Sequence, residues 1–226
     1  MVRLSSLSIA PLFLLAACGL GLEPLTPDEL DAGPDSDLGD PVTVSLTGRT
    51  YAADIAGITV LEPEGLGPLM QETVKGTLLF HVTADRGDQV DLVLTLGDDQ
   101  GRQDPCTKVY ALPSADWTGN PALAIEDGTT RIDIAERPVD LSSLSMVALV
   151  RDDGQEWTNT HIRTLVDTRD LQGGSLPEGT DVCGLVAELG GECMVCDDGE
   201  PVCAVLELAM DMVEVDTGFD LDAGHC

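Results

Sequence analysis

The stretch that decides the fold is residues 73–96, TVKGTLLFHVTADRGDQVDLVLTL, in which two apolar runs flank a polar turn. The runs are Thr73–Thr83 and Gln89–Leu96, and Asp85-Arg86-Gly87-Asp88 separates them. Apolar runs bounded by a Gly-containing turn are typical of a β-hairpin that covers a core. We therefore predict an antiparallel hairpin in this part of the chain.

An alternation of apolar and polar residues, the two-residue period of a β-strand, continues on both sides of the hairpin. The further expected strands are Val42–Leu46, Tyr51–Ile55, Ile58–Leu61, Thr107–Leu112, Thr130–Ala135, Leu144–Arg151 and Glu156–Asp167. The last two are joined at Asp152-Asp153-Gly154, and Asp-Gly is the strongest short turn signal. About eight to ten strands with little helix predict a mainly β fold, an antiparallel sandwich or barrel.

Two segments depart from the strand pattern. Asp181–Leu189 is the one stretch expected to be helical, with Thr180 as its cap and Gly190-Gly191 at its end. Gly65–Glu72 contains Pro68 and is expected to form a loop or a single turn. The predicted β fold therefore carries one short helix.

The first seventeen residues have the build of a secretory signal. Arg3 precedes an apolar stretch from Leu7 to Ala17, which is too short to span a bilayer. The stretch ends in Leu15-Ala16-Ala17-Cys18, which resembles the lipobox of bacterial lipoproteins. The resemblance implies cleavage before Cys18, a diacylglycerol-derived group on the Cys18 thiol, and an acyl chain such as palmitate on the new amine.

The resemblance also implies a location. Gly19 follows the cysteine, whereas an Asp at that position is the usual signal for retention in the inner membrane. We therefore expect a lipid-anchored protein of the cell envelope, at the outer membrane of a two-membraned bacterium, with the membrane itself as a partner. The alternatives are an ordinary cleaved signal peptide in which Cys18 is incidental, or a short buried apolar helix.

The segment that follows is rich in acids and prolines. Residues 19–41 contain Pro24, Pro27, Pro34 and Pro41 and no base, a composition typical of a flexible, extended spacer. The expected division is a signal peptide at 1–17, an acidic tether at 18–41, a β domain at 42–175 and a cysteine-rich segment at 176–226. The last segment is either an appendage or the completion of the β domain.

Six cysteines remain when Cys18 is set aside, and an envelope location makes disulfides their default state. They are Cys106, Cys183, Cys193, Cys196, Cys203 and Cys226. Because most of them lie near the C-terminus, we expect a disulfide-tied C-terminal segment. Cys196 and Cys203 stand symmetrically about residues 198–201, so a four-residue hairpin loop there would make them face each other. The complete pairing is left open.

Cys193 and Cys196 form a Cys-x-x-Cys motif, for which redox chemistry and zinc binding are the alternatives. A redox cysteine needs a helix N-terminus to lower its pKa, whereas Gly190-Gly191 precedes this motif. Zinc could use four of the cysteines, but exported thiols are more often oxidised than metallated. We therefore expect structural disulfides and no metal cofactor.

The cysteine motif also carries a resemblance. Cys193-x-x-Cys196-x-Asp198-Gly199 with a later Cys203, preceded by Cys183 and residues 166–169, is similar to a pattern in uncharacterised predicted lipoproteins of myxobacteria and related deltaproteobacteria. The similarity covers residues 50–210 loosely and is specific around the cysteines. It implies a lineage and a topology, and no activity.

The charge balance limits the partners. Acids number 41 against 11 Lys plus Arg, a net charge of −30, which makes nucleic acid a poor partner. Weak calcium candidates are Asp216, Asp220 and Asp222, although their spacing fits no established loop. Adaptation to salty surroundings explains the acidity equally well.

No catalytic motif stands out, so we expect a non-enzymatic binding or structural module of the cell envelope, not an enzyme. One alternative is a carrier of a small apolar or acyl ligand in a β-barrel, since aromatic residues make up only 3% and aliphatic side chains must supply the core. A second alternative is a hydrolase with an unrecognised carboxylate or calcium site. A large apolar cavity would favour the carrier, and converging acids with perturbed pKa values would favour the hydrolase.

Overall fold

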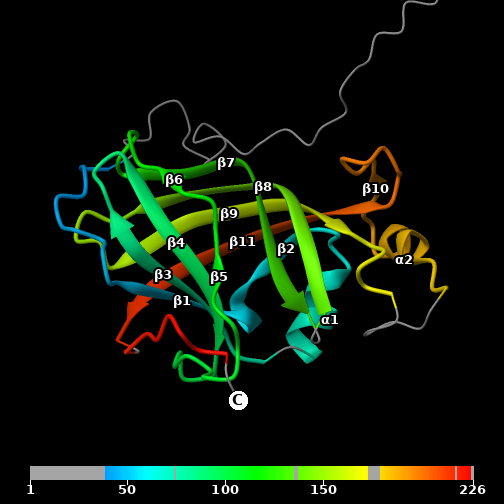
Figure 1. The fold of residues 1–226 in the computed structure, drawn as a ribbon, viewed down its shortest axis with the longest axis horizontal. Helices are drawn as coiled ribbons and strands as arrows, with labels where there is room; N and C mark the ends of the chain where they lie inside the picture. Colours follow the sequence, from blue (N-terminus) through cyan, green and yellow to red (C-terminus); the bar gives the residue numbers. More distant parts are fainter. Residues whose placement is uncertain (1–38, 74, 135–136, 173–178, 217, 225–226) are drawn as a thin grey trace, which may run out of the picture.

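Eight antiparallel strands close into a barrel in the computed structural model, which describes residues 39–73, 75–134, 137–172, 179–216 and 218–224 (Figure 1). In order around the barrel they are β1 (Thr50–Asp54), β3 (Thr77–Asp85), β4 (Gln89–Gly97), β6 (Ala115–Asp116), β7 (Ala122–Ile134), β8 (Arg137–Val150), β9 (Glu156–Asp167) and β11 (Cys203–Val215). The pairing of β11 with β1 closes the wall. The mainly β, antiparallel prediction is confirmed, and the closure decides for a barrel over a sandwich.

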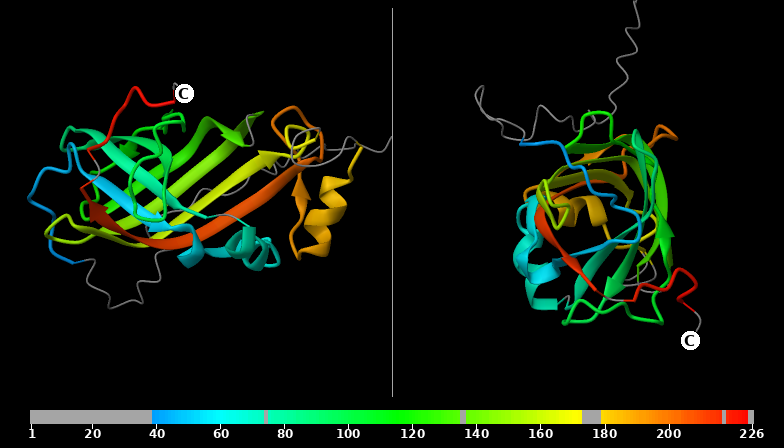
Figure 2. Two further views of the ribbon diagram at one scale, coloured as in Figure 1. Left: turned by 90° about the horizontal axis from the view of Figure 1, so that it is seen from below. Right: turned by 90° about the vertical axis from the view of Figure 1, so that its left-hand side faces the viewer.

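Smaller elements surround this wall. β2 (Thr59–Glu62) and β10 (Cys193–Met194) both pair with β11, and β5 (Tyr110–Ala111) pairs with β4. The helical elements are η2 (Ile55–Gly57), α1 (Leu66–Thr73) and α2 (Val182–Glu188). Figure 1 shows α1 and α2 at the same end of the barrel, and the left view of Figure 2 shows α2 beyond the ends of the long strands.

The predicted hairpin is present as β3 and β4, paired from Thr77 with Gly97 to Asp85 with Val90. β11, from the cysteine-rich segment, runs between β9 and β1 and forms part of the barrel wall. Its alternate residues face inward, since Leu208 and Met212 both pack in the main core. The C-terminal segment therefore supplies a wall strand as well as its disulfide-tied part.

Two strands are longer than predicted because bulges interrupt their alternation. β7 begins at Ala122 and not at Thr130, and its register shifts beside Asp127, which has a φ of 47°. β8 begins at Arg137 and not at Leu144, with a shift beside Ser143, which has a φ of 46°. A bulge inserts an extra residue, so that side chains at odd positions face inward before it and side chains at even positions face inward after it, or the reverse. The alternation in the sequence therefore indicated only one half of each strand.

The predicted strand Val42–Leu46 is wrong. This segment is irregular, and its N–H groups bond to side chains: Val42 N–H to Asn120 Oδ1 at 2.8 Å and Leu46 N–H to Asp85 Oδ2 at 3.0 Å. Its apolar alternation instead places Val42 and Leu46 in the core, with Leu46 fully buried. Alternation reports which residues are buried, and an irregular segment can bury alternate residues too.

Three local predictions also need correction. Residues Leu66–Thr73 form α1, not a loop, because Pro68 lies in the first turn, where no N–H needs an intrahelical partner. Only Tyr110–Ala111 of the predicted strand Thr107–Leu112 is a strand. The predicted helix Asp181–Leu189 is confirmed as α2, but Asp181 is its cap, since its Oδ1 accepts a 2.9 Å bond from the Gly184 N–H.

Candidate functional site

One end of the barrel interior is filled by large side chains, and we call it the closed end. Tyr51 and Trp157 pack with their ring centroids 4.5 Å apart, and Phe80 lies 6.4 Å from Trp157. The Tyr51 hydroxyl donates a 2.7 Å bond to the carbonyl oxygen of Gly154. Leu46 is fully buried in the same cluster. These buried side chains fill this end of the interior, and their burial of Tyr51 raises its pKa to about 12.

The other half of the interior is hollow. A cavity of about 300 Å³ lies between the strand ends that approach α1, and we call this the cavity end. The strands contribute inward residues at alternate positions, such as Leu94 and Leu96 of β4 and Leu206 and Leu208 of β11. Met70 of α1 and Ile55 of η2 complete the wall. The right view of Figure 2, taken along the barrel, shows how the strands surround this interior.

The lining of the cavity is apolar, with one exception. Among the described residues that line it, Thr164 is the single polar one, and its hydroxyl donates a 3.0 Å bond to the carbonyl oxygen of Ser142. Leu78, Leu94 and Ile162 remain partly exposed although they point into the barrel. Aliphatic side chains that are enclosed by the wall but not covered by one another form a surface that an apolar molecule can cover.

The disulfide-tied segment lies at the cavity end. Cys183 of α2 is bonded to Cys193 of β10, and Cys196 is bonded to Cys203 of β11. The two cysteines of the Cys-x-x-Cys motif thus belong to different disulfides, and Cys196 and Cys203 face each other as expected. Cys106 is also disulfide-bonded, whereas Cys18 and Cys226 lie outside the described residues.

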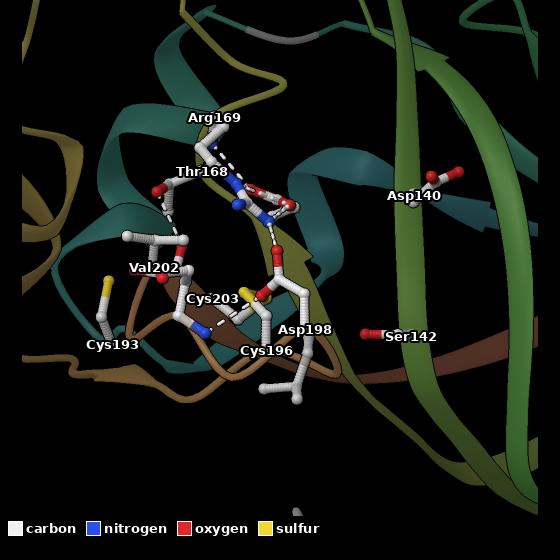
Figure 3. Close-up of a disulfide and its surroundings, with 12 residues drawn as sticks. Asp140, Ser142, Thr168, Arg169, Cys193, Cys196, Asp198, Val202 and Cys203 are labelled. Atoms are coloured by element: carbon white, nitrogen blue, oxygen red, sulfur yellow. Dashed lines mark hydrogen bonds and ion pairs between the residues drawn. A yellow bond between two sulfur atoms is a disulfide. The ribbon is translucent and has the colours of Figure 1, made fainter.

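An ionic clamp joins β9 to this segment. Arg169, just after β9, donates to Asp167 Oδ1 at 2.9 Å and to Asp198 Oδ2 at 2.7 Å, beside the Cys196–Cys203 disulfide (Figure 3). The bond from Arg169 lowers the pKa of Asp167. The pKa of Asp198 is lowered first by the backbone N–H of Glu200 and then by Arg169. The clamp holds the loop before β11 against the end of β9.

The weak calcium candidates are not gathered as ligands. Asp220 Oδ1 accepts the N–H of Asp222 at 2.9 Å, which makes a local turn, and Asp216 lies elsewhere, in a surface pocket beside Arg49. Across the described ranges, no three His, Cys, Asp or Glu side chains are arranged to hold a metal ion. The Asp220 side chain therefore acts in the structure as a turn residue.

Glu62 and His81 are two of the groups outside the cavity whose pKa values are shifted. The pKa of Glu62 is raised, mainly by burial and further by Glu192 and Glu207, but Glu62 does not line the cavity. Burial lowers the pKa of His81, which bonds to Thr50 Oγ1 at 2.9 Å and stacks on Phe219 with centroids 4.3 Å apart. His81 thus fastens the C-terminal tail to the outside of β3.

Sequence reasoning did not locate the cavity. Its only signal was a chain poor in aromatic residues and rich in aliphatic ones, which applies to the whole barrel. Comparisons with protein-family models, curated proteins and solved structures found no match. Within the described part of the chain, no helix has both the length and the apolar character needed to cross a membrane.

Proposed function

We propose that this protein binds one small apolar molecule inside its barrel and acts as a carrier or receptor for it. The observation that supports this proposal is the hollow half of the interior, with its apolar lining and a volume of about 300 Å³. An eight-stranded barrel is just wide enough either to be filled by side chains or to hold one small ligand. In this barrel, side chains fill the closed end, whereas the cavity end keeps space for one small ligand.

The energetics favour an apolar guest. Each Å² of apolar surface that a ligand covers contributes about 25 cal/mol, and Leu78, Leu94 and Ile162 all offer uncovered surface inside the wall. A barrel with a purely structural role gains stability by packing its interior to native density. The uncovered lining is therefore the feature that distinguishes a carrier from a structural module.

The proposed lipid anchor at Cys18 would keep the barrel close to a membrane, which is a source of apolar molecules. The lipobox at residues 15–18 and the acidic tether at 18–41 would hold the barrel near a membrane without burying it. Several acyl chains anchor a protein stably, whereas one chain does not. Such a protein could receive an apolar molecule from the membrane, or deliver one to it, within reach of the tether.

The test is binding of the uncharged dye N-phenylnaphthylamine, whose fluorescence increases in apolar surroundings. Leu96 lines the cavity and is 41% exposed, whereas Leu61 on β2 is 38% exposed and lies outside it. We expect Leu96→Trp to fill part of the cavity and to weaken dye binding at least about tenfold, a change of about 1.4 kcal/mol. Leu61→Trp should leave the affinity unchanged.

Equal loss of affinity in both variants, or no saturable binding by the unaltered protein, would count against a ligand in the barrel. Melting temperatures of the two variants serve as the folding control. Because both leucines are similarly exposed, neither substitution removes a buried side chain from the core.

A further inference from the structure

The size of the cavity limits the guest to one chain. A water molecule occupies about 30 Å³ in the liquid, roughly the space of a methylene group, so 300 Å³ holds a chain of about ten carbons. Phe80 lies where the cavity meets the closed end and packs beside Trp157. These rings therefore limit how deep a guest can extend, and the volume matches one chain of about this length.

The described lining of the cavity offers no free side-chain hydrogen-bond donor to a polar head group. Thr164 carries the one hydroxyl among the lining residues that the structure describes, and this O–H already donates to the Ser142 carbonyl oxygen. Burying a polar group without a hydrogen bond costs about 2–7 kcal/mol. A guest with a head group must consequently leave that group at the cavity end, among the charged side chains there.

The bases near the cavity lining are already bound to protein oxygens. The ion pairs are Arg131–Asp140, Lys108–Asp133, Arg163–Glu207 and Arg169 with both Asp167 and Asp198. The ammonium group of Lys75 donates to the carbonyl oxygen of Gln71 at 2.9 Å and lies in a surface pocket with Asp98 and Asp99. An incoming anion would have to compete with a carboxylate for each of the paired bases, and at Lys75 it would meet Asp98 and Asp99 in the same pocket.

Acids are in excess in the same region. Glu62 and Glu207 are register partners in the β2–β11 pair, and the charges of Glu192 and Glu207 add to burial in raising the pKa of Glu62. The whole chain carries a net charge of −30. The potential around the cavity end is therefore negative and repels anions over about one Debye length.

We propose that the cavity takes a single-chain amphiphile of about ten carbons whose head group is uncharged or cationic, and that it discriminates against fatty acids. This inference rests on the proposed function, because it names the ligand class of the same cavity. The discrimination comes from charge: the apolar chain contributes equally in all cases, and only the head group meets the acidic surroundings.

Decanol, decylamine and decanoate share one chain length and test the head group alone, by displacement of N-phenylnaphthylamine. At about 0.01 M salt, where the Debye length is about 30 Å, we expect decanoate to bind about tenfold more weakly than decanol, and decylamine at least as tightly as decanol. At 1 M salt, with a Debye length of about 3 Å, the gap should close.

Reversing one charge at the cavity end tests whether the head-group preference arises there. Asp140 neutralises Arg131 and adjoins the lining residue Leu141, so Asp140→Lys should strengthen decanoate binding and weaken decylamine binding. Asp88→Lys makes the same change in net charge in the β3–β4 turn at the closed end. This control should leave the ratio of the two affinities unchanged.

The outcomes separate the two proposals. Decanoate binding as tightly as decanol at low salt, or an equal effect of both charge reversals, would overturn the head-group inference while the carrier function stands. If neither the dye nor decanol binds, the proposed function itself fails. The salt series on the unaltered protein decides the matter even where a variant does not fold.

Discussion

The backbone N–H of Gly224 donates a 2.8 Å hydrogen bond to the carbonyl oxygen of Pro105. Gln103 reinforces this contact, since its side chain accepts from the Asp220 N–H at 2.7 Å and donates to the Asp220 carbonyl oxygen at 2.8 Å. The last described residues of the chain are thus held against the loop between β4 and β5. That loop contains Cys106, which is disulfide-bonded.

We predict that Cys106 is bonded to Cys226, which lies two residues beyond Gly224 and outside the described residues. Four of the other cysteines already form the Cys183–Cys193 and Cys196–Cys203 disulfides. Cys18 is expected to carry the lipid. Peptide mapping without reduction should recover a fragment that joins Cys106 to Cys226. In Cys226→Ser, one thiol should become alkylatable, and it should be that of Cys106. A Cys106 that remains linked in this variant would disprove the pairing.

We predict that Tyr51 ionises only at about pH 12, because burial favours its neutral form. The corresponding stability is present below the unfolded value of about 10 and is lost as pH rises through about 12, by about 3 kcal/mol. The chain has two tyrosines, so absorbance titration of Tyr110→Phe reports on Tyr51 alone. Tyr51→Phe should remove this alkaline loss and cost about 1 kcal/mol at neutral pH. Titration of Tyr51 near pH 10 in the folded protein would contradict the burial argument.

Arg169→Gln should raise the pKa of Asp167 toward its ordinary value, because the bond from Arg169 is the main cause of its lowered pKa. Asp198 should respond less, since the Glu200 N–H contributes most there. A lowered carboxyl pKa gives stability that is present above the ordinary value of about 4 and is lost as pH falls. Carboxyl NMR titration measures both pKa values. Arg151→Gln, which breaks the exposed pair with Glu156, is the control, and a similar change at Asp167 in both variants would refute the clamp.

The double variant Cys183→Ser with Cys193→Ser should detach α2 while the barrel stays folded. α2 has seven residues, and an isolated helix of that length is marginal in water. We expect a loss of about 2–3 kcal/mol in the free energy of unfolding and rapid hydrogen exchange in α2, with β9 and β11 still protected. The double serine variant of Cys196 and Cys203 should leave α2 protected. Loss of protection throughout β11 in the first variant would mean that the barrel depends on this bridge.

Cys18→Ser should release the protein from membranes, because its thiol is the only lipidation target in the lipobox. Detergent phase separation measures the partition, and a Ser5→Ala variant in the same signal serves as the control. Continued partition of the Cys18→Ser variant into the detergent phase would show that the lipobox interpretation is wrong.

Local patterns in the sequence were enough for the class of fold and for several elements. The alternation of apolar residues and the Asp-Gly turn located β4 and β9 closely and most of β3, because a strand with one buried face imposes that alternation on its own residues. The predicted run for β3 began at Thr73, which is the last residue of α1. The spacing of Cys196 and Cys203 about a turn indicated their disulfide for the same local reason. The first parts of β7 and β8 were not predicted, because bulges interrupt the alternation of inward and outward residues in these strands.

Only the tertiary structure decided that the barrel closes between β1 and β11 and that one half of its interior is hollow. Alternation tells which residues face inward, but the space left among them depends on the number, tilt and stagger of all the strands. The cavity combines Met70 of α1, Leu94 of β4 and Leu206 of β11, which are far apart in the chain. The closed end is filled because Leu46, Tyr51 and Trp157 meet there. No single stretch of sequence contains that difference between the two ends.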